Sequence, residues 1–181
     1  ELGHVVEQVA PPFPAEQIWD SWITLRSFAV AAGLKDFVGR EDQLKDTAIW
    51  EMQRGLAMSG TQIQKASEQR SNWHRVAVKL FLEYDALVMP TAQCWPFDVD
   101  IDYPREIAGV AMDTYHRWMQ VVVPVSLLGL PSLAVPAGFG DAGLPMGIQV
   151  FGALGRDREV LELGKGYHEA TKWPEKRPQP R

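Results

Sequence analysis

The sequence predicts an α/β fold in which a mixed β-sheet is flanked by helices. Short apolar runs bounded by proline and glycine alternate with longer segments in which apolar residues recur every three or four positions. The short runs are typical of strands and the longer segments of helices. This alternation favours helices packed on a sheet over an all-helical bundle. The 181 residues show neither an internal repeat nor a clear linker, so we interpret them as one domain or part of one.

The first third of the chain is predicted to be one strand followed by helices. The strand lies near His4–Val9 and runs into a proline-rich turn. Helical spacing then extends from Pro14 to about Val38. A second helical region runs from Glu41 to Glu83; it is broken or softened near Gly55 and near Met58–Gln62, where Ser59 and Thr61 can cap a new helix.

Three short apolar runs predict the remaining strands of the sheet. They lie at Leu87–Met89, Leu133–Val135 and Gly147–Phe151. A glycine-rich turn joins the last two runs, which predicts that these strands are neighbours along the chain and in the sheet.

Two more helices complete the prediction. The segment from Tyr103 to Val123 has helical spacing, and Pro124 is expected to end or kink the helix because proline lacks the amide hydrogen that a helix interior requires. The last helix runs from about Asp157 to Trp173 and opens with an acidic side chain, as the helix dipole favours. Residues 174–181 are expected to form an extended tail.

Composition limits the partners and the compartment that we expect. A net charge of −5 and scattered basic residues offer no face for phosphates, so no nucleic-acid partner is expected. The longest apolar run, Val121 to Leu130, is far shorter than the roughly 20 residues that a membrane helix needs, so no membrane partner is expected either. Cys94 is the only cysteine and cannot form an intrachain disulfide, which favours a cytoplasmic location.

The residues alone specify no catalytic or metal site. The four histidines lie far apart, with no carboxylate or cysteine at metal-ligand spacing, so neither a metal nor a cofactor is expected. No Gly-x-Ser-x-Gly turn and no phosphate-binding glycine loop is present. Cys94 has no basic neighbour that sequence can identify, so we interpret it as a passive thiol.

Several spaced motifs nevertheless resemble one known family. Two Gly-Leu-Pro steps, at Gly129–Pro131 and Gly143–Pro145, bracket the "AVPAGF" run at Ala134–Phe139, and "GIQVFG" follows. Together with "YDALVMPTA", the opening "GHVVEQVAPP" and the final "HEATKWPEKRP", they closely resemble the C-terminal part of the amidase signature family. Taken by itself, each Gly-Leu-Pro step is best explained as a turn that brings a short strand into a sheet.

The resemblance implies an enzyme that hydrolyses a carboxamide through an acyl-enzyme. Members of this family use a serine nucleophile, a bridging cis-serine and a lysine, set in a glycine- and serine-rich signature, with backbone amides that hold the oxyanion. This chain contains no Ser-Ser pair and no glycine-serine cluster. We therefore expect no catalytic residue in the chain, with the serines and the lysine upstream of Glu1 in a missing N-terminal part. The chain alone is then expected to be inactive.

Three functions remain open at this point. The first is an amidase of small or aromatic amides, with a small-molecule amide and the missing N-terminal part as partners and a possible homodimer as the family-level state. The second is the A-type subunit of an amidotransferase that acts on charged tRNA; it would need an RNA-facing surface, which the acidic balance disfavours. The third is a non-catalytic scaffold or binding protein that keeps this half of the fold.

One helical face is a candidate for the substrate pocket. His116, Met119 and Val123 recur at spacings of three and four, and in relatives the helix before the Gly-x-Pro step lines the acyl-binding channel. Trp95 is expected to close the mouth of that channel. Ser126 departs from the family, in which asparagine is frequent at this position. The alternative is that the face packs on the sheet and that Trp95 packs on the surface.

Overall fold

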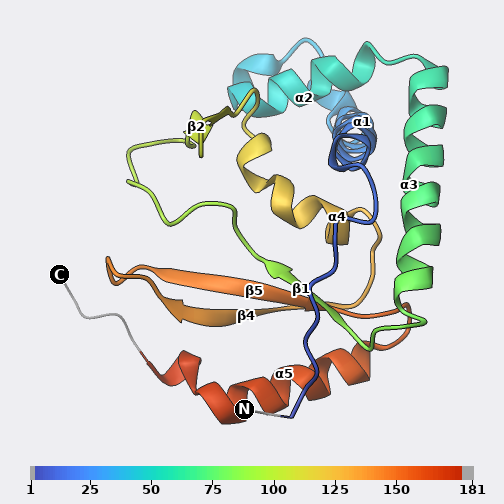
Figure 1. Ribbon diagram of the computed structural model, residues 1–181. Coiled ribbons are helices and arrows are strands. Elements are labelled where there is room, and N and C mark those ends of the chain that lie inside the picture. The colour runs from blue at the N-terminus through green and yellow to red at the C-terminus, as the bar shows by residue number, and fades with distance from the viewer. Residues whose placement is uncertain (1–2, 177–181) are drawn as a thin grey trace. The chain divides into compact units, whose positions relative to one another are not determined.

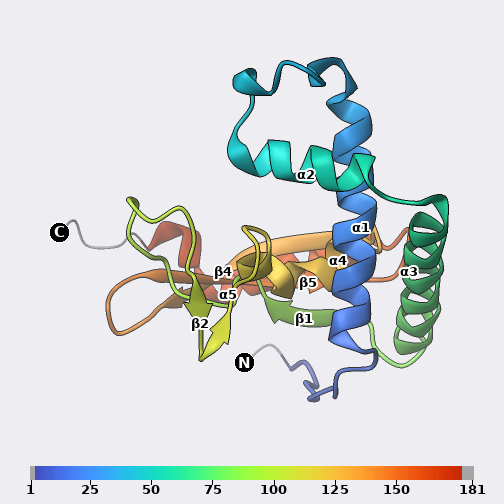
Figure 2. The ribbon, with the colours of Figure 1, turned by 90° about the horizontal axis from the view of Figure 1, so that it is seen from above.

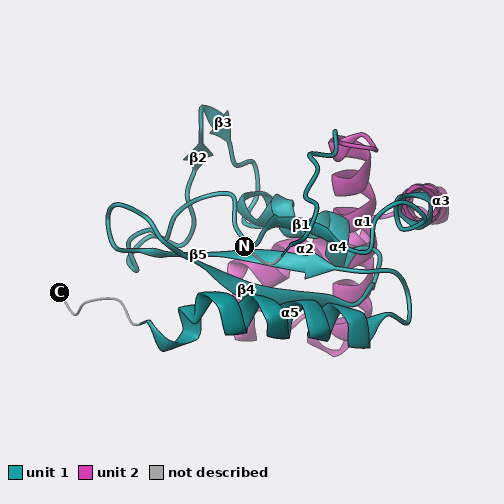
Figure 3. Ribbon diagram, turned by 60° about the horizontal axis from the view of Figure 1, so that its bottom comes forward, with its two compact units in different colours: residues 1–10, 77–181 teal, residues 11–76 magenta. Residues whose placement is uncertain are grey.

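The structure, a computed structural model, describes residues 3–176. The chain divides into two compact units, residues 1–10 with 77–181 and residues 11–76 (Figure 3). We call them the sheet unit and the helical unit. No helix among the described residues is both long enough and apolar enough to cross a bilayer.

The helical unit confirms the predicted helices in the first third of the chain. α3 begins at the predicted cap: Gln62 N donates to Ser59 Oγ at 3.3 Å, and Ser59 N donates to Gln62 Oε1 at 2.9 Å, which is a capping box. Its elements, shown in blue to green in Figure 1, are α1 (Ala15–Gly33), two short 3-10 turns (η1, Lys35–Phe37; η2, Glu41–Gln43), α2 (Asp46–Leu56) and α3 (Gly60–Leu80), which continues into the sheet unit.

α1 and α2 pack closely against each other at Gly55, near the end of α2. Because α2 ends at Leu56, the next residue, the predicted break near Gly55 is confirmed. A Cβ at this position would lie 2.2 Å from the backbone oxygen of Ser27, so the glycine lets the two backbones approach. The buried carboxylate of Glu51 accepts two hydrogen bonds from Arg26, at 2.6 and 3.2 Å, across the same pair of helices.

The sheet unit contains a three-stranded sheet in the order β1-β5-β4. Its strands are β1 (Leu87–Pro90), β5 (Pro145–Phe151) and β4 (Ser132–Phe139), and both pairs are antiparallel. Val150 of β5 pairs with Val88 on one side and with Leu133 on the other. These strands confirm three of the four predicted strands and the α/β class.

The fourth predicted strand, His4–Val9, was wrong. Residues 3–10 have no regular secondary structure, and Val5 and Val6 are each 88% exposed. A strand is stable only with a hydrogen-bonded neighbour, and among the described residues no strand pairs with this segment. A hydrogen bond of 3.3 Å from the Tyr84 hydroxyl to Glu7 Oε2 ties it to the rest of the sheet unit.

α5 (Asp157–Thr171) covers one face of the sheet and confirms the last predicted helix (Figure 1). Gly164 faces the side chain of Leu133 on β4, and the Tyr167 hydroxyl donates to the backbone oxygen of Pro136 at 2.8 Å. The expected extended tail begins with a 3-10 turn, η4 (Trp173–Glu175), and its residues 177–181 lie outside the described residues.

The predicted helix from Tyr103 to Val123 was wrong over most of its length. Its first half contains a small hairpin of β2 (Glu106–Ile107) and β3 (Val110–Ala111). The two turn residues, Ala108 and Gly109, have φ angles of 49° and 80°, as in the turns that suit a two-residue hairpin.

The second half of that segment is a 3-10 helix followed by a short α-helix. η3 (Arg117–Val122) leads directly into α4 (Val123–Ser126), in the yellow part of the chain in Figure 2. Pro124, which was expected to end or kink a helix, instead lies in the first turn of α4, where a missing amide hydrogen costs nothing.

Candidate functional site

The structure distributes the predicted pocket residues over two helices and the loop after β1. His116 caps η3 and is 3% exposed, with its ring edge-to-face on Tyr115 at 5.2 Å. Met119 lies one turn later and is half-buried; its N–H donates to the backbone oxygen of His116 at 3.0 Å. Because residues three apart align in a 3-10 helix, His116 and Met119 share one side of η3. Val123 belongs to α4 and is 1% exposed.

Trp95 packs at the turn between β4 and β5. A Cβ at Gly140 would lie 2.7 Å from the ring of Trp95, so the indole lies directly over this glycine. The ring of Trp173 covers Gly138 in the same way and meets Phe139 edge-to-face at 6.2 Å. Two tryptophans thus hold the tip of the hairpin, and Trp95 itself remains 50% exposed.

Two residues that the sequence did not indicate attach η3 to the loop after β1. The side chain of Gln93 bonds the backbone of η3 at Arg117 and at Val121, at 3.1 and 3.0 Å. Phe97 meets Trp118 edge-to-face at 5.4 Å. A glutamine and a phenylalanine in a proline-rich loop carry no pattern from which these contacts could be predicted.

The charged and titratable groups near η3 form no nucleophile and base pair. Arg117 donates to both oxygens of Asp113, at 3.1 and 3.0 Å, which holds the pKa of that carboxyl below its usual value. Burial raises the pKa of the Cys94 thiol. A thiol with a raised pKa is protonated at neutral pH and is a weak nucleophile. Among the described residues, no group of three His, Cys, Asp or Glu side chains is placed to hold a metal ion.

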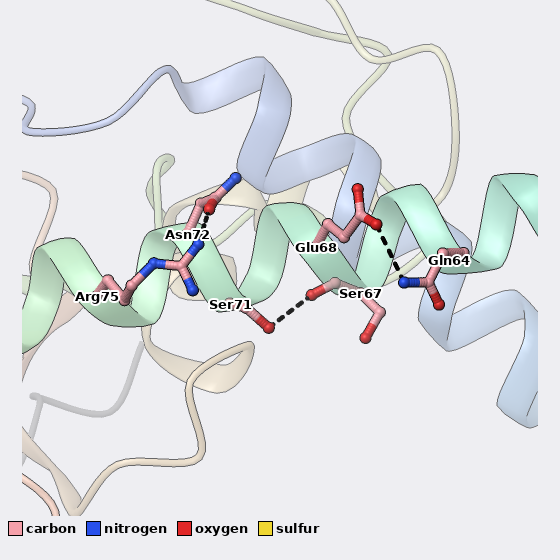
Figure 4. Close-up of a pocket in the computed structure, with 6 residues that line it drawn as sticks. All are labelled: Gln64, Ser67, Glu68, Ser71, Asn72 and Arg75. Carbon is pink, nitrogen blue, oxygen red and sulfur yellow. Dashed lines mark hydrogen bonds between the residues drawn. The ribbon is translucent and has the colours of Figure 1, made fainter.

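A hollow of about 410 Å³ lies on the polar face of α3 (Figure 4). Its polar side chains all come from this one helix and bond within it: Gln64 to Glu68, Arg75 to Asn72 and Ser71 to the backbone of Ser67. A site needs groups that converge from several elements. We therefore interpret the hollow as part of a solvated helix face rather than as a substrate pocket.

Comparisons with known proteins agree on one family. The model of the Amidase family matches residues 1–161. The acylamidase of Rhodococcus erythropolis is 26% identical over 98% of this chain and 38% of its own length. The A-type subunit of the glutamyl-tRNA(Gln) amidotransferase of Synechococcus elongatus is 35% identical, over 54% of this chain and 19% of its own length. The chain thus spans well under half the length of these relatives.

Solved structures show the same fold. The crystal structure of an amidase, 26% identical, superposes with a TM-score of 0.77 over 87% of this chain and 36% of its own. A bacterial aryl acylamidase, 23% identical, gives a TM-score of 0.78 over 91% of this chain and 36% of its own. The family match over most of the sequence, together with this fold, shows that the chain belongs to the amidase signature family.

Proposed function

We propose that the chain is the C-terminal part of an amidase that hydrolyses a small or aromatic carboxamide through a serine acyl-enzyme. This proposal rests on the extent of the similarity to an acylamidase, which covers 98% of this chain. The serine nucleophile and the lysine are supplied by an N-terminal part of the same protein.

The side chains of the described residues support the proposal that the nucleophile and its base come from another part of the protein. Amide hydrolysis requires a hydroxyl activated by an adjacent base and donors aimed at the developing oxyanion. The one thiol, Cys94, has a raised pKa, and Arg117 is engaged by Asp113. The chain would contribute strands of the sheet and part of the substrate pocket, while the reacting groups come from elsewhere.

The A-type subunit of an amidotransferase that acts on charged tRNA is the second candidate. The similarity to such subunits is higher in identity, 35%, but covers only 54% of this chain. The structure of such a subunit from Thermotoga maritima gives a TM-score of 0.53, against 0.78 for the aryl acylamidase. These differences, and the net charge of −5, favour the amidase. A non-catalytic scaffold with this half of the fold is the third candidate.

An assay of the full-length protein separates the three candidates. The amidase is expected to release 4-nitroaniline from 4-nitroacetanilide. With hydroxylamine present it should also form acetohydroxamate, because an acyl-enzyme can pass its acyl group to water or to hydroxylamine. The amidotransferase would instead release ammonia from glutamine when its partner subunits and charged tRNA are added. A protein that hydrolyses neither this anilide nor a series of small aliphatic amides, and that releases no ammonia from glutamine, would be a scaffold.

Within the amidase, we assign the acyl side of the pocket to Met119, with His116 behind it and Trp95 at the mouth. Met119 supports this assignment because it is half-buried and shares one side of η3 with His116. Val123 was part of the same predicted wall, but its 1% exposure favours a core position.

Substitution of Met119 by Trp in the full-length enzyme tests this pocket. A pocket position is expected to shift preference from larger to smaller acyl groups, by about tenfold or more in kcat/KM ratio, because the added ring volume occupies acyl space. The thermal midpoint should stay close to that of the wild type. A lower midpoint with an unchanged ratio would instead make Met119 a core residue.

A further inference from the structure

The side chain of Gln93 lies between two backbone groups of η3. Its Nε2 donates to the backbone oxygen of Arg117 at 3.1 Å, and its Oε1 accepts from the backbone N–H of Val121 at 3.0 Å. These two groups are four residues apart, and in an α-helix they would bond each other. The carboxamide therefore occupies both ends of one α-helical hydrogen bond.

The spacing of the backbone hydrogen bonds changes along this part of the chain. Before it, the bonds join residues three apart: Arg117 N to Thr114 O at 3.1 Å and Met119 N to His116 O at 3.0 Å. After it, α4 contains a bond between residues four apart, Leu127 N to Val123 O at 2.9 Å, and ends with one between residues three apart, Leu128 N to Val125 O at 3.1 Å. A side chain inserted into the backbone ladder is a known cause of such a break.

η3 needs support from outside because it is long for its type. It has six residues, whereas 3-10 helices rarely exceed about four because their hydrogen bonds are poorer. The two hydrogen bonds from the half-buried Gln93 supply such support, because each one stabilises the backbone geometry that it bridges.

We infer that Gln93 is a positioning residue, which holds Arg117–Val122 in the 3-10 form and thereby sets where Met119 points. A 3-10 helix turns by about 120° per residue and an α-helix by about 100°, so the three steps from Met119 to the end of η3 at Val122 differ by about 60° between the two forms. If η3 forms the acyl side of the pocket, which rests on the proposed function, Gln93 controls acyl selection without touching the substrate.

Two substitutions at Gln93 in the full-length protein test this role. Gln93→Met keeps the length of the side chain and removes both hydrogen bonds. Gln93→Glu keeps the acceptor for Val121 and removes the donor for Arg117. Gln43→Met, at an exposed glutamine of the helical unit, is the matched control.

The first readout is the crystal structure of each variant. In Gln93→Met the Val121 N–H is expected to bond the Arg117 oxygen directly, whereas the control keeps the 3-10 form. If Gln93→Met proves insoluble, Gln93→Glu is expected to move the Arg117 oxygen away from position 93. An unchanged backbone over 117–122 in the variant that is solved would overturn the inference, whatever the enzyme hydrolyses.

The second readout is the kcat/KM ratio between a small and a bulky acyl anilide. It is expected to change by about tenfold in Gln93→Met and by less in Gln93→Glu, with no change in the control. A rearranged η3 with an unchanged ratio would contradict the role in selection. A wild-type protein with no amidase activity would refute the proposed function, and the crystal structures would still decide whether Gln93 holds η3.

Discussion

At the scale of single residues, the hairpin of β2 and β3 contains a strained position. Ala108 has a φ of 49°, in the left-handed region that disfavours residues with a Cβ. The next residue, Gly109, has a φ of 80° and is suited to its place. Turns of this kind favour Asn-Gly, so alanine is the weaker choice at the first position.

Replacing Ala108 by asparagine is therefore expected to stabilise the protein. The free energy of unfolding should rise by about 0.5–1 kcal/mol, because asparagine tolerates the left-handed conformation better. Denaturant unfolding of the full-length protein measures the change. Ala111→Asn, at the end of β3 and at an ordinary φ, is the control and should give no gain. Equal effects at the two positions would show that the turn is not strained.

At the scale of elements, the packing of α1 on α2 depends on the absence of a side chain at Gly55. A Cβ there would lie 2.2 Å from the backbone oxygen of Ser27 and 2.6 Å from the Cβ of Ala31. Backbone atoms cannot turn aside as the end of a flexible side chain can. The two helices would have to move apart.

Gly55→Ala is accordingly expected to lower the free energy of unfolding by about 3 kcal/mol, through overpacking between two helices. Gly33→Ala, at the end of α1 with no atom within 4 Å of the new Cβ, should be neutral or stabilising by up to about 1 kcal/mol. The two variants are compared by thermal and denaturant unfolding. A loss at Gly55 no larger than that at Gly33 would refute the close approach of the helices.

The elements that could be predicted from sequence are those determined by local signals. The apolar spacing of α1, the acidic first turn of α5, the cap at Ser59 and the glycine-rich turn between β4 and β5 all act within a few residues of the chain. Three strands were predicted for the same reason, since short apolar runs ended at proline or glycine.

The elements that could not be predicted depend on residues distant in sequence. The sequence around η3 has the spacing of an α-helix, but the segment forms a 3-10 helix. Its backbone is bonded by the side chain of Gln93, which lies more than twenty residues earlier. The segment near His4–Val9 has the composition of a strand but no strand partner among the described residues. For the site, His116 and Met119 are three residues apart, a spacing that keeps them on one side of a 3-10 helix as well as of an α-helix, whereas the expected place of Val123 on the same face assumed an α-helix that η3 does not form.

At the scale of the whole molecule, the 181-residue chain is expected to hydrolyse no amide, ester or anilide when purified alone. The described residues offer no activated nucleophile, and the pKa of the Cys94 thiol is raised rather than lowered. Release of 4-nitroaniline from 4-nitroacetanilide, compared with the full-length protein at equal concentration, measures this. Turnover by the isolated chain that disappears on substituting Cys94 or His116 would contradict the proposed division of labour.

The most direct measurement is the location of the reactive residue in the full-length protein. A fluorophosphonate reacts covalently with an activated serine, and mass spectrometry of the digested protein identifies the labelled peptide. We predict one adduct, on a serine of a glycine- and serine-rich segment N-terminal to this chain, with loss of amidase activity in proportion to labelling. An adduct on a residue of this chain, such as Ser59, Ser132 or Cys94, with the same proportional loss of activity, would contradict the proposal that the nucleophile comes from outside it.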